Sequence, residues 1–296
     1  MRCHRVAGLV VVGAFLCSSC SDEPARTSVL PTAPTQASVT TGVAVSGKVY
    51  DTGSRVIAGA RVEVVNGPNA GQSVITTGDG GFNISGAFDV VTEFRASKDG
   101  HEAAMKKMSP YCERCNPHHW MYFALALPVP PVNVAGDYTF TVTADSTCAT
   151  LPEHARQRTY TTMIAATASQ PTRLNTSFFS TASGANLLTN VAWEGLWFSV
   201  AADYVELVMG DLHGQPGLVE QTDANAYFNV GGIGSTTLGA GGVSTFTMAL
   251  DADIVHCELR PGVTPLDQDG RFECPSSAIV KSVCRSRNHQ VTFTRR

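Results

Sequence analysis

From residue 43 to the C-terminus, short apolar segments alternate with clusters of glycine, aspartate, asparagine and proline. The clearest cluster is the turn Gly78–Gly81, which follows Thr76 and Thr77 and precedes Phe82. Glycine takes positive φ at little cost, so the chain can reverse at this turn, and the flanking residues suit a half-buried sheet. Strands of this length at this spacing predict an all-β protein.

Seven apolar segments between residues 43 and 127 predict a β-sandwich. They are Val43–Val45, Lys48–Tyr50, Arg61–Val65, Ser73–Thr76, Phe82–Ile84, Thr92–Ala96 and Met121–Leu125. Trp120 precedes the last of these segments and is interpreted as an anchor of the core, with a sugar-binding platform as the alternative.

Four motifs in residues 43–127 resemble the carboxypeptidase regulatory-like domain, a transthyretin-like sandwich that is often grouped with carbohydrate-binding-like folds. They are Gly47–Asp51, Ile57–Val62, Thr76–Phe82 and Phe94–His101. Domains of that family are usually non-catalytic accessory modules. The resemblance therefore implies a scaffolding or binding role, and it implies carbohydrate as a ligand by analogy of fold.

An insert before the last strand of this domain departs from the family pattern. It contains Cys112 and Cys115, followed by His118 and His119. Three interpretations remain open: a disulfide between the two cysteines, a zinc-like site that combines the thiolates with a histidine, and a redox-active pair. The disulfide is preferred because an exported protein meets an oxidising compartment, and no metal or other cofactor is predicted.

The second half begins after a proline-rich linker, residues 128–135, and extends over residues 136–296. Strict alternation in Gly136–Ala144 returns in Thr245–Leu250 and Gln290–Thr294, which indicates half-buried antiparallel strands. Five further candidate strands are Arg158–Ile164, Arg173–Ser180, Leu196–Val200, Tyr204–Val208 and Ala226–Val230, and a helical turn is predicted at Leu151–Arg156. About eight strands whose first and last members both alternate predict a closed antiparallel barrel.

This second half also resembles a lipocalin-like barrel of envelope lipoproteins. The motifs that carry the resemblance are Gly136–Thr143 with Cys148, Leu151-Pro152, Arg158–Tyr160 and His289–Thr294. If such a barrel has a cavity, Trp193, Trp197 and Phe198 would line it and favour a small apolar ligand, although a place in the core is the preferred interpretation.

The N-terminus has the features of a bacterial secretory signal over residues 1–19. Two arginines precede the apolar run Val6–Leu16, which ends in small residues directly before Cys20. This arrangement resembles a lipoprotein signal, although Cys17 stands where that family usually has a larger aliphatic residue. The resemblance implies a lipid-anchored Cys20 and, because Ser21 follows it, an outer-membrane location; ordinary signal cleavage is the alternative. Residues 20–42 are predicted to be a flexible linker.

The remaining cysteines are even in number, which favours structural disulfides over reactive thiols. Cys148, Cys257, Cys274 and Cys284 allow three sets of pairings. Barrel closure brings the first and last strands together, so Cys148–Cys284 and Cys257–Cys274 are preferred.

The charge of the chain and the placement of its acidic residues and histidines bear on two possible functions. The net charge is −4 without an extended basic cluster, so nucleic acid is not a predicted partner. Asp211 with His213, and His256 with Glu258, could supply acid–base chemistry, but scattered surface groups are the preferred interpretation.

The sequence therefore predicts a non-catalytic envelope lipoprotein that binds or scaffolds, with the membrane and a glycan or protein as partners. One alternative is a carrier of a small apolar ligand, and another is a hydrolase or thiol–metal protein centred on the cysteine insert.

Overall fold

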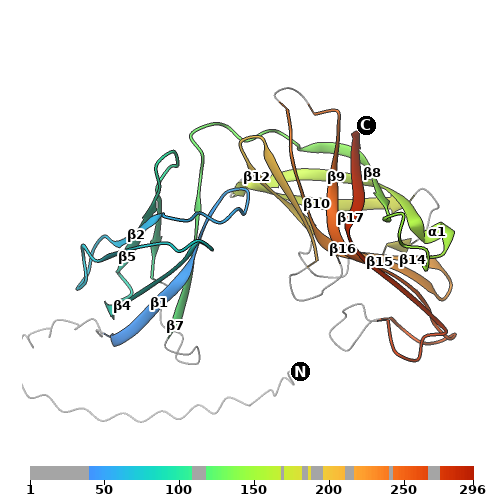
Figure 1. Ribbon diagram of the computed structural model, residues 1–296, viewed down its shortest axis with the longest axis horizontal. Coiled ribbons are helices and arrows are strands. Elements are labelled where there is room, and N and C mark those ends of the chain that lie inside the picture. The colour runs from blue at the N-terminus through green and yellow to red at the C-terminus, as the bar shows by residue number, and fades with distance from the viewer. Residues whose placement is uncertain are drawn as a thin grey trace, which may run out of the picture. The chain divides into compact units, whose positions relative to one another are not determined.

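The computed structural model describes residues 40–108, 118–167, 170–181, 186–187, 196–210, 217–239, 243–265 and 274–296. Within these ranges the chain forms β-strands and one short helix (Figure 1). The predicted all-β class, a sandwich followed by a closed antiparallel barrel, is confirmed. No helix in the described part of the chain has the length and apolarity that crossing a membrane requires.

The sandwich domain consists of a three-stranded sheet, β4-β1-β7, and a four-stranded sheet, β3-β2-β5-β6. The strands are β1 Thr40–Asp51, β2 Arg61–Val64, β3 Ser73–Ile75, β4 Gly81–Phe88, β5 Glu93–Ser97, β6 Ala104–Lys107 and β7 His118–Leu125. Strand β7 runs parallel to β1, whereas the other neighbours are antiparallel. Val49 of β1, Phe94 of β5 and Phe123 of β7 belong to one buried core, so the two sheets pack face to face.

Strand β1 joins two segments that the sequence analysis separated at Gly47. A Cβ atom at Gly47 would lie 1.7 Å from the backbone oxygen of Met121, so the glycine permits close approach of β7 and does not break the strand. Strand β6 was not predicted. Its Ala104-Met-Lys-Lys107 pattern is largely exposed and carries little apolar signal.

The turn Gly78–Gly81 links the two sheets. Gly80 has a φ of 75°, and the backbone N–H of Thr77 donates to the carbonyl of Gly81 at 2.9 Å. Strand β3 before the turn belongs to the four-stranded sheet and β4 after it to the three-stranded sheet, where Phe82 enters the core. The predicted reversal is therefore present, and it connects two layers.

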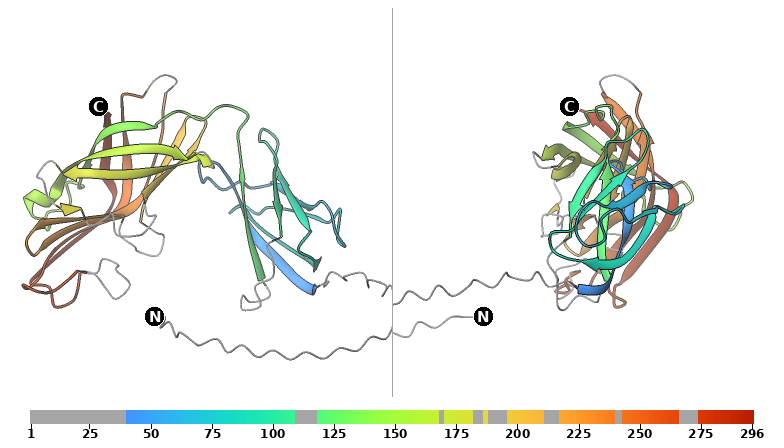
Figure 2. Two further views of the ribbon diagram at one scale, coloured as in Figure 1. Left: turned by 180° about the vertical axis from the view of Figure 1, so that it is seen from behind. Right: turned by 90° about the vertical axis from the view of Figure 1, so that its left-hand side faces the viewer.

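The barrel contains eight strands in the order β15-β13-β12-β10-β9-β8-β17-β16, and pairing of β16 with β15 closes it (Figures 1 and 2). These strands are β8 Gly136–Thr143, β9 Gln157–Thr167, β10 Gln170–Thr181, β12 Leu196–Ala201, β13 Tyr204–Met209, β15 Ala226–Thr237, β16 Thr245–Glu258 and β17 Val280–Arg295. Seven of the eight include the predicted segments in full, and β8 ends one residue before the predicted Ala144. Helix α1, Glu153–Arg156, occupies the predicted helical turn.

Two further strands were not predicted. Strand β14, Leu218–Asp223, pairs with the first residues of β15, and the short β11, Asn186–Leu187, pairs with β14. Strand β14 extends the barrel wall at one end. Its inward positions, Leu218 and Glu220, are completely buried.

Aromatic side chains fill the middle of the barrel. The ring of Phe293 stacks on Phe246 with centroids 4.8 Å apart and lies 4.6 Å from Phe140 and 5.3 Å from Phe198. All four side chains are buried. At this level, side chains occupy the space that an apolar ligand would need, and Phe198 belongs to the core.

The two domains have separate hydrophobic cores, one built from residues 45–125 and the other from residues 134–293. The proline-rich linker lies between them, but its last residues already belong to the barrel. Val134 is completely buried there, and its carbonyl accepts a hydrogen bond from the Tyr138 hydroxyl at 3.0 Å.

Candidate functional site

The outer face of the three-stranded sheet carries exposed aromatic side chains. Because alternate residues of a strand point to opposite faces, Met121 and Phe123 enter the core while Trp120 and Tyr122 point away from it. Trp120 is 67% exposed and Tyr122 is 51% exposed. The prediction that Trp120 anchors the core is therefore wrong, and the alternative of a surface platform fits its position.

Strand β1 adds a third ring to this face. Tyr50 lies on its outward side, and its ring centroid is 6.3 Å from that of Tyr122, with the planes 34° apart. Trp120 and Tyr122 are two residues apart on one strand, which places them about 7 Å from each other along it. We call Tyr50, Trp120 and Tyr122 the aromatic platform.

Polar groups border the aromatic platform. Ser46 is the register partner of Trp120 on one side and of Asn83 in β4 on the other, and Lys48 is the partner of Tyr122. The ammonium group of Lys48 forms an exposed ion pair with Asp79 at 3.3 Å. The platform thus combines flat apolar surfaces with hydrogen-bonding groups at their edge.

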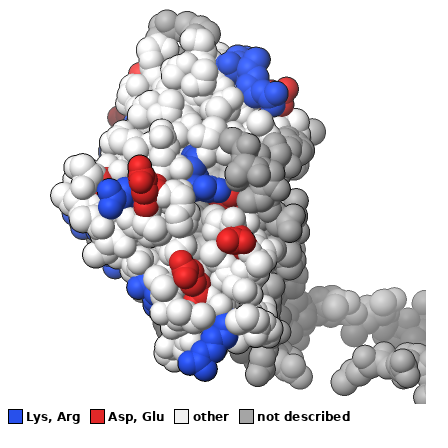
Figure 3. Space-filling view, turned by 90° about the vertical axis from the view of Figure 1, so that its right-hand side faces the viewer, with Lys and Arg blue, Asp and Glu red and all other residues white. Residues whose placement is uncertain are grey.

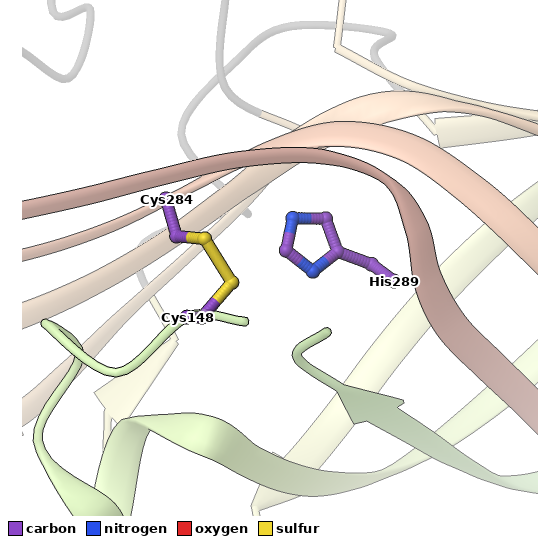
Figure 4. Close-up of side chains that lie close together, drawn as sticks. All are labelled: Cys148, Cys284 and His289. Atoms are coloured by element: carbon purple, nitrogen blue, oxygen red, sulfur yellow. A yellow bond between two sulfur atoms is a disulfide. The ribbon is translucent and has the colours of Figure 1, made fainter. Parts of the chain in front are cut away.

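The structure contains both disulfides that the sequence analysis preferred for the second half of the chain. Cys148 is bonded to Cys284, and Cys257 to Cys274. His289 lies beside the first disulfide (Figure 4). Among the described residues, Cys148, Cys284 and His289 are the only three potential metal ligands whose donor atoms all lie within 4.8 Å of one another.

The hydrogen bonding of His289 argues against a metal at this cluster. The backbone N–H of Asp145 donates to Nδ1 of His289 at 3.0 Å, so the proton of the neutral ring resides on Nε2. Burial lowers the pKa of His289 and keeps the ring neutral. A metal on Nε2 would need Nδ1 to be protonated and facing an acceptor, but it faces a donor. With both sulfurs bonded to each other, the cluster is structural.

A polar group of side chains occupies one end of the barrel interior. The Glu220 carboxylate is completely buried and accepts hydrogen bonds from Arg158 Nε at 2.8 Å and from the Tyr160 hydroxyl at 2.9 Å. A second guanidinium nitrogen of Arg158 also contacts Glu220. Burial opposes the charge of Arg158, but the hydrogen bonds and charge of Glu220 outweigh it and raise the Arg158 pKa. Burial, followed by Glu220, raises the pKa of Tyr160 above its ordinary value.

A cavity of about 580 Å³ opens beside this group. Its walls include His154 of α1, Arg158 of β9, Thr222 of β14 and Glu258 of β16. His256 lies next to two of these residues. Its ring centroid is 5.1 Å from that of His154, and its Nε2 is 3.9 Å from a carboxylate oxygen of Glu258. Sequence reasoning identified His256 and Glu258 but missed His154, Arg158 and Glu220.

Most of the other predicted site residues fall in parts of the chain that the structure does not describe. Cys20, Cys112, Cys115, Trp193, Asp211 and His213 lie outside the described residues, and His118 and His119 begin β7. Trp197 is half-buried on the barrel wall, and the guanidinium carbon of Arg173 lies 4.6 Å from its ring centroid. The predicted insert site therefore stays a prediction.

Charged side chains are interspersed on the face drawn in Figure 3. Acidic and basic groups lie among larger uncharged areas, and the described residues of this face form no continuous basic surface. Specific contacts, more than a broad electrostatic field, would therefore have to select a partner on this face.

The described residues define an all-β protein: a sandwich of two sheets, with seven described strands, followed by a closed antiparallel barrel of eight described strands. No family model and no curated protein matches the chain. It is similar to a solved structure from Bacteroides fragilis described as a "putative membrane-associated protein of unknown function". The two share 10% sequence identity, the match covers 86% of this chain and 97% of that one, and the TM-score is 0.24. A TM-score this low supports no statement about function.

Proposed function

We propose that this protein is a non-catalytic envelope lipoprotein whose sandwich domain binds carbohydrate through the aromatic platform. The observation that carries the proposal is the joint exposure of Trp120 and Tyr122 on one flat sheet face, next to Tyr50. The signal-like N-terminus supports the envelope location, and the lipid anchor at Cys20 would tether the chain to the membrane.

Carbohydrate fits this surface on chemical grounds. The face of an aromatic ring carries partial negative charge, and the C–H groups of a pyranose ring carry partial positive charge, so the two stack. Three aromatic side chains on one face of the sheet offer places for more than one sugar unit. The hydroxyl of Ser46, the amide of Asn83 and the ammonium of Lys48 can hydrogen-bond sugar hydroxyls at the platform's edge.

Large exposed aromatic side chains also need an explanation on a secreted surface. Contiguous apolar patches on soluble domains commonly mark interaction sites. Tryptophan and tyrosine suit such sites because they combine a broad apolar face with one polar group and lose little conformational entropy on binding. A carbohydrate covers the rings while leaving its own outer hydroxyls in water.

Binding of the mature protein to immobilised glycans, followed by calorimetry on the best glycan, tests the proposal. Trp120→Ala and Tyr122→Ala should each weaken binding roughly tenfold or more, because each removes one stacking surface. Ile75→Ala is the matched control, since Ile75 is 61% exposed but lies on β3 of the other sheet. Absence of glycan binding, or equal losses in the control, would contradict the proposal; capture of a protein that depends on Trp120 would assign the platform to a protein partner.

A further inference from the structure

His256 is a buried polar side chain whose hydrogen-bonding capacity is unused. It continues the inward-facing series of β16 that includes Leu250, Ala252 and Ile254, and it is 1% exposed. Neither of its ring nitrogens has a hydrogen-bond partner among the residues that the structure describes. Buried polar groups in native proteins are nearly always hydrogen-bonded. The described part of the protein supplies no partner for His256, so a bound ion or ligand is a candidate for that partner.

The two groups nearest to His256 are metal ligands by type. The rings of His154 and His256 lie 5.1 Å apart, nearly perpendicular to each other, and Glu258 Oε1 is 3.9 Å from Nε2 of His256. Two imidazoles that share a tetrahedral zinc ion have ring centroids roughly 5 Å apart, given zinc–nitrogen distances of about 2.0–2.1 Å. The separation of the two ring centroids therefore matches that of two imidazoles on one zinc ion. The donor atoms of His154, His256 and Glu258 do not all lie within 4.8 Å of one another, so the exposed side chains have to turn toward His256 when metal binds.

The residues around His154 hold it near this position. Arg158 donates from a guanidinium nitrogen to the backbone carbonyl of His154 at 3.3 Å, and the same guanidinium is bound by the buried carboxylate of Glu220. A buried ion pair thus anchors the short helix that carries the exposed imidazole. Such outer contacts orient the first ligands of a metal site.

We infer that His154, His256 and Glu258 form a binding site for a divalent transition-metal ion of the zinc class. Imidazole nitrogens with one carboxylate select such ions over Mg²⁺ and Ca²⁺, which prefer oxygen ligands alone. His154 and Glu258 are exposed enough to rotate the short distance that metal coordination requires, while His256 is fixed by packing. The cavity of about 580 Å³ leaves the remaining coordination position open to water or to a small ligand.

This site differs from the two cysteine sites considered above. Its ligands come from α1 and the end of β16, and none is a cysteine. It therefore binds metal in the oxidised protein, without reduction of either disulfide. It is also independent of carbohydrate binding by the aromatic platform, so either proposal can fail without the other.

Calorimetric titration of the mature protein, purified without a histidine tag, with Zn²⁺ and separately with Mg²⁺ tests this inference. We expect one Zn²⁺ ion per chain and no comparable Mg²⁺ binding. His154→Ala and Glu258→Gln should each weaken Zn²⁺ binding about tenfold or more. His256→Gln should remove it, and His101→Ala, a substitution in the sandwich domain, should leave it unchanged.

Circular dichroism of each variant separates loss of a metal ligand from loss of the fold. The His154→Ala variant is the decisive one, because His154 is exposed and its replacement should leave the fold intact. X-ray absorption at the zinc edge should report two imidazoles and oxygen donors without sulfur. The inference is overturned if the native protein does not bind Zn²⁺, or if His154→Ala and Glu258→Gln bind it as tightly as the native protein. Zinc binding that is lost only on replacing Cys112 and Cys115 would likewise overturn it and place the metal in the insert.

Discussion

The two disulfides close loops of very different length, which predicts different contributions to stability. Cys148–Cys284 spans 136 residues of sequence and Cys257–Cys274 spans 17. The chain-entropy relation gives about 5 kcal/mol for the long loop and about 3 kcal/mol for the short one. Cys148, Cys257 and Cys274 are buried and Cys284 is partly buried, so the packing losses on substitution by alanine differ only by that one partly exposed side chain. The double variant C148A/C284A should therefore be about 2 kcal/mol less stable than C257A/C274A.

Urea unfolding of the protein without reductant measures this difference. The unfolded chain of C148A/C284A is released from its large loop, so its m-value should also increase. Equal destabilisation of the two variants, within about 0.5 kcal/mol, would refute the loop-entropy reasoning. A larger loss for C257A/C274A would show instead that local packing around the short loop dominates.

Three further predictions follow from single positions. Gly47→Ala should abolish the pairing of β1 with β7 and destabilise the sandwich by several kcal/mol. Gly78→Ala is the control: no atom lies within 4 Å of its added Cβ, so it should destabilise the protein by about 1 kcal/mol or less. Thermal unfolding compares the two variants. Glu220→Gln should destabilise the barrel by about 3–5 kcal/mol in urea, because it leaves the buried guanidinium without its counter-charge, and a loss below 1 kcal/mol would contradict this. Hydrogen bonds, chiefly from Thr77 and Ser286 respectively, lower the pKa values of Asp79 and Asp145 from 3.8 to about 2. The stability that these two carboxylates give the folded state is complete above about pH 4 and is lost as the pH falls through about 2. Asp79→Asn and Asp145→Asn should therefore each reduce the loss of unfolding free energy that acid causes in the native protein.

The barrel could be predicted because its inward positions obey a simple period. Tyr138, Phe140 and Val142 alternate with threonines, and all three are completely or almost completely buried. The same rule failed for β14, where Glu220 occupies an inward position and interrupts the apolar pattern. Its partner Arg158 is 62 residues away, so no local signal could show that the charge is paired.

For Trp120 the sequence analysis preferred the core over the surface platform, and it did not single out Tyr50 or Tyr122, because both faces of β7 are apolar. Met121, Phe123 and Leu125 alternate with Trp120 and Tyr122, and periodicity alone does not say which face is buried. The chemistry of the side chains does provide a signal. The buried series has no polar atom able to hydrogen-bond strongly, whereas indole and phenol groups need a partner or water, so Trp120 and Tyr122 are the better candidates for the outer face.

His256 was assigned to the surface because the predicted strand ended at Leu250. Strand β16 continues to Glu258, and extending its period of two from Phe246 through Ile254 places His256 on the inner face. A β-bulge between Leu250 and Ala252 in the pairing with β17 does not change this series. Continuing the alternation to the next turn signal would have found the buried histidine.

The two buried histidines, His256 and His289, should contribute differently to the stability of the barrel. His289 accepts a hydrogen bond at Nδ1, so His289→Leu should destabilise the barrel by about 1–3 kcal/mol by leaving the Asp145 N–H unpaired. His256 has no such bond to any described residue, so His256→Leu removes an unsatisfied polar group and should stabilise the metal-free barrel by about 1 kcal/mol while removing Zn²⁺ binding. Urea unfolding in the presence of a chelator measures both variants. A loss of stability in His256→Leu equal to that in His289→Leu would show that His256 is a structural residue with a partner inside the protein, and the metal site would lose its main support.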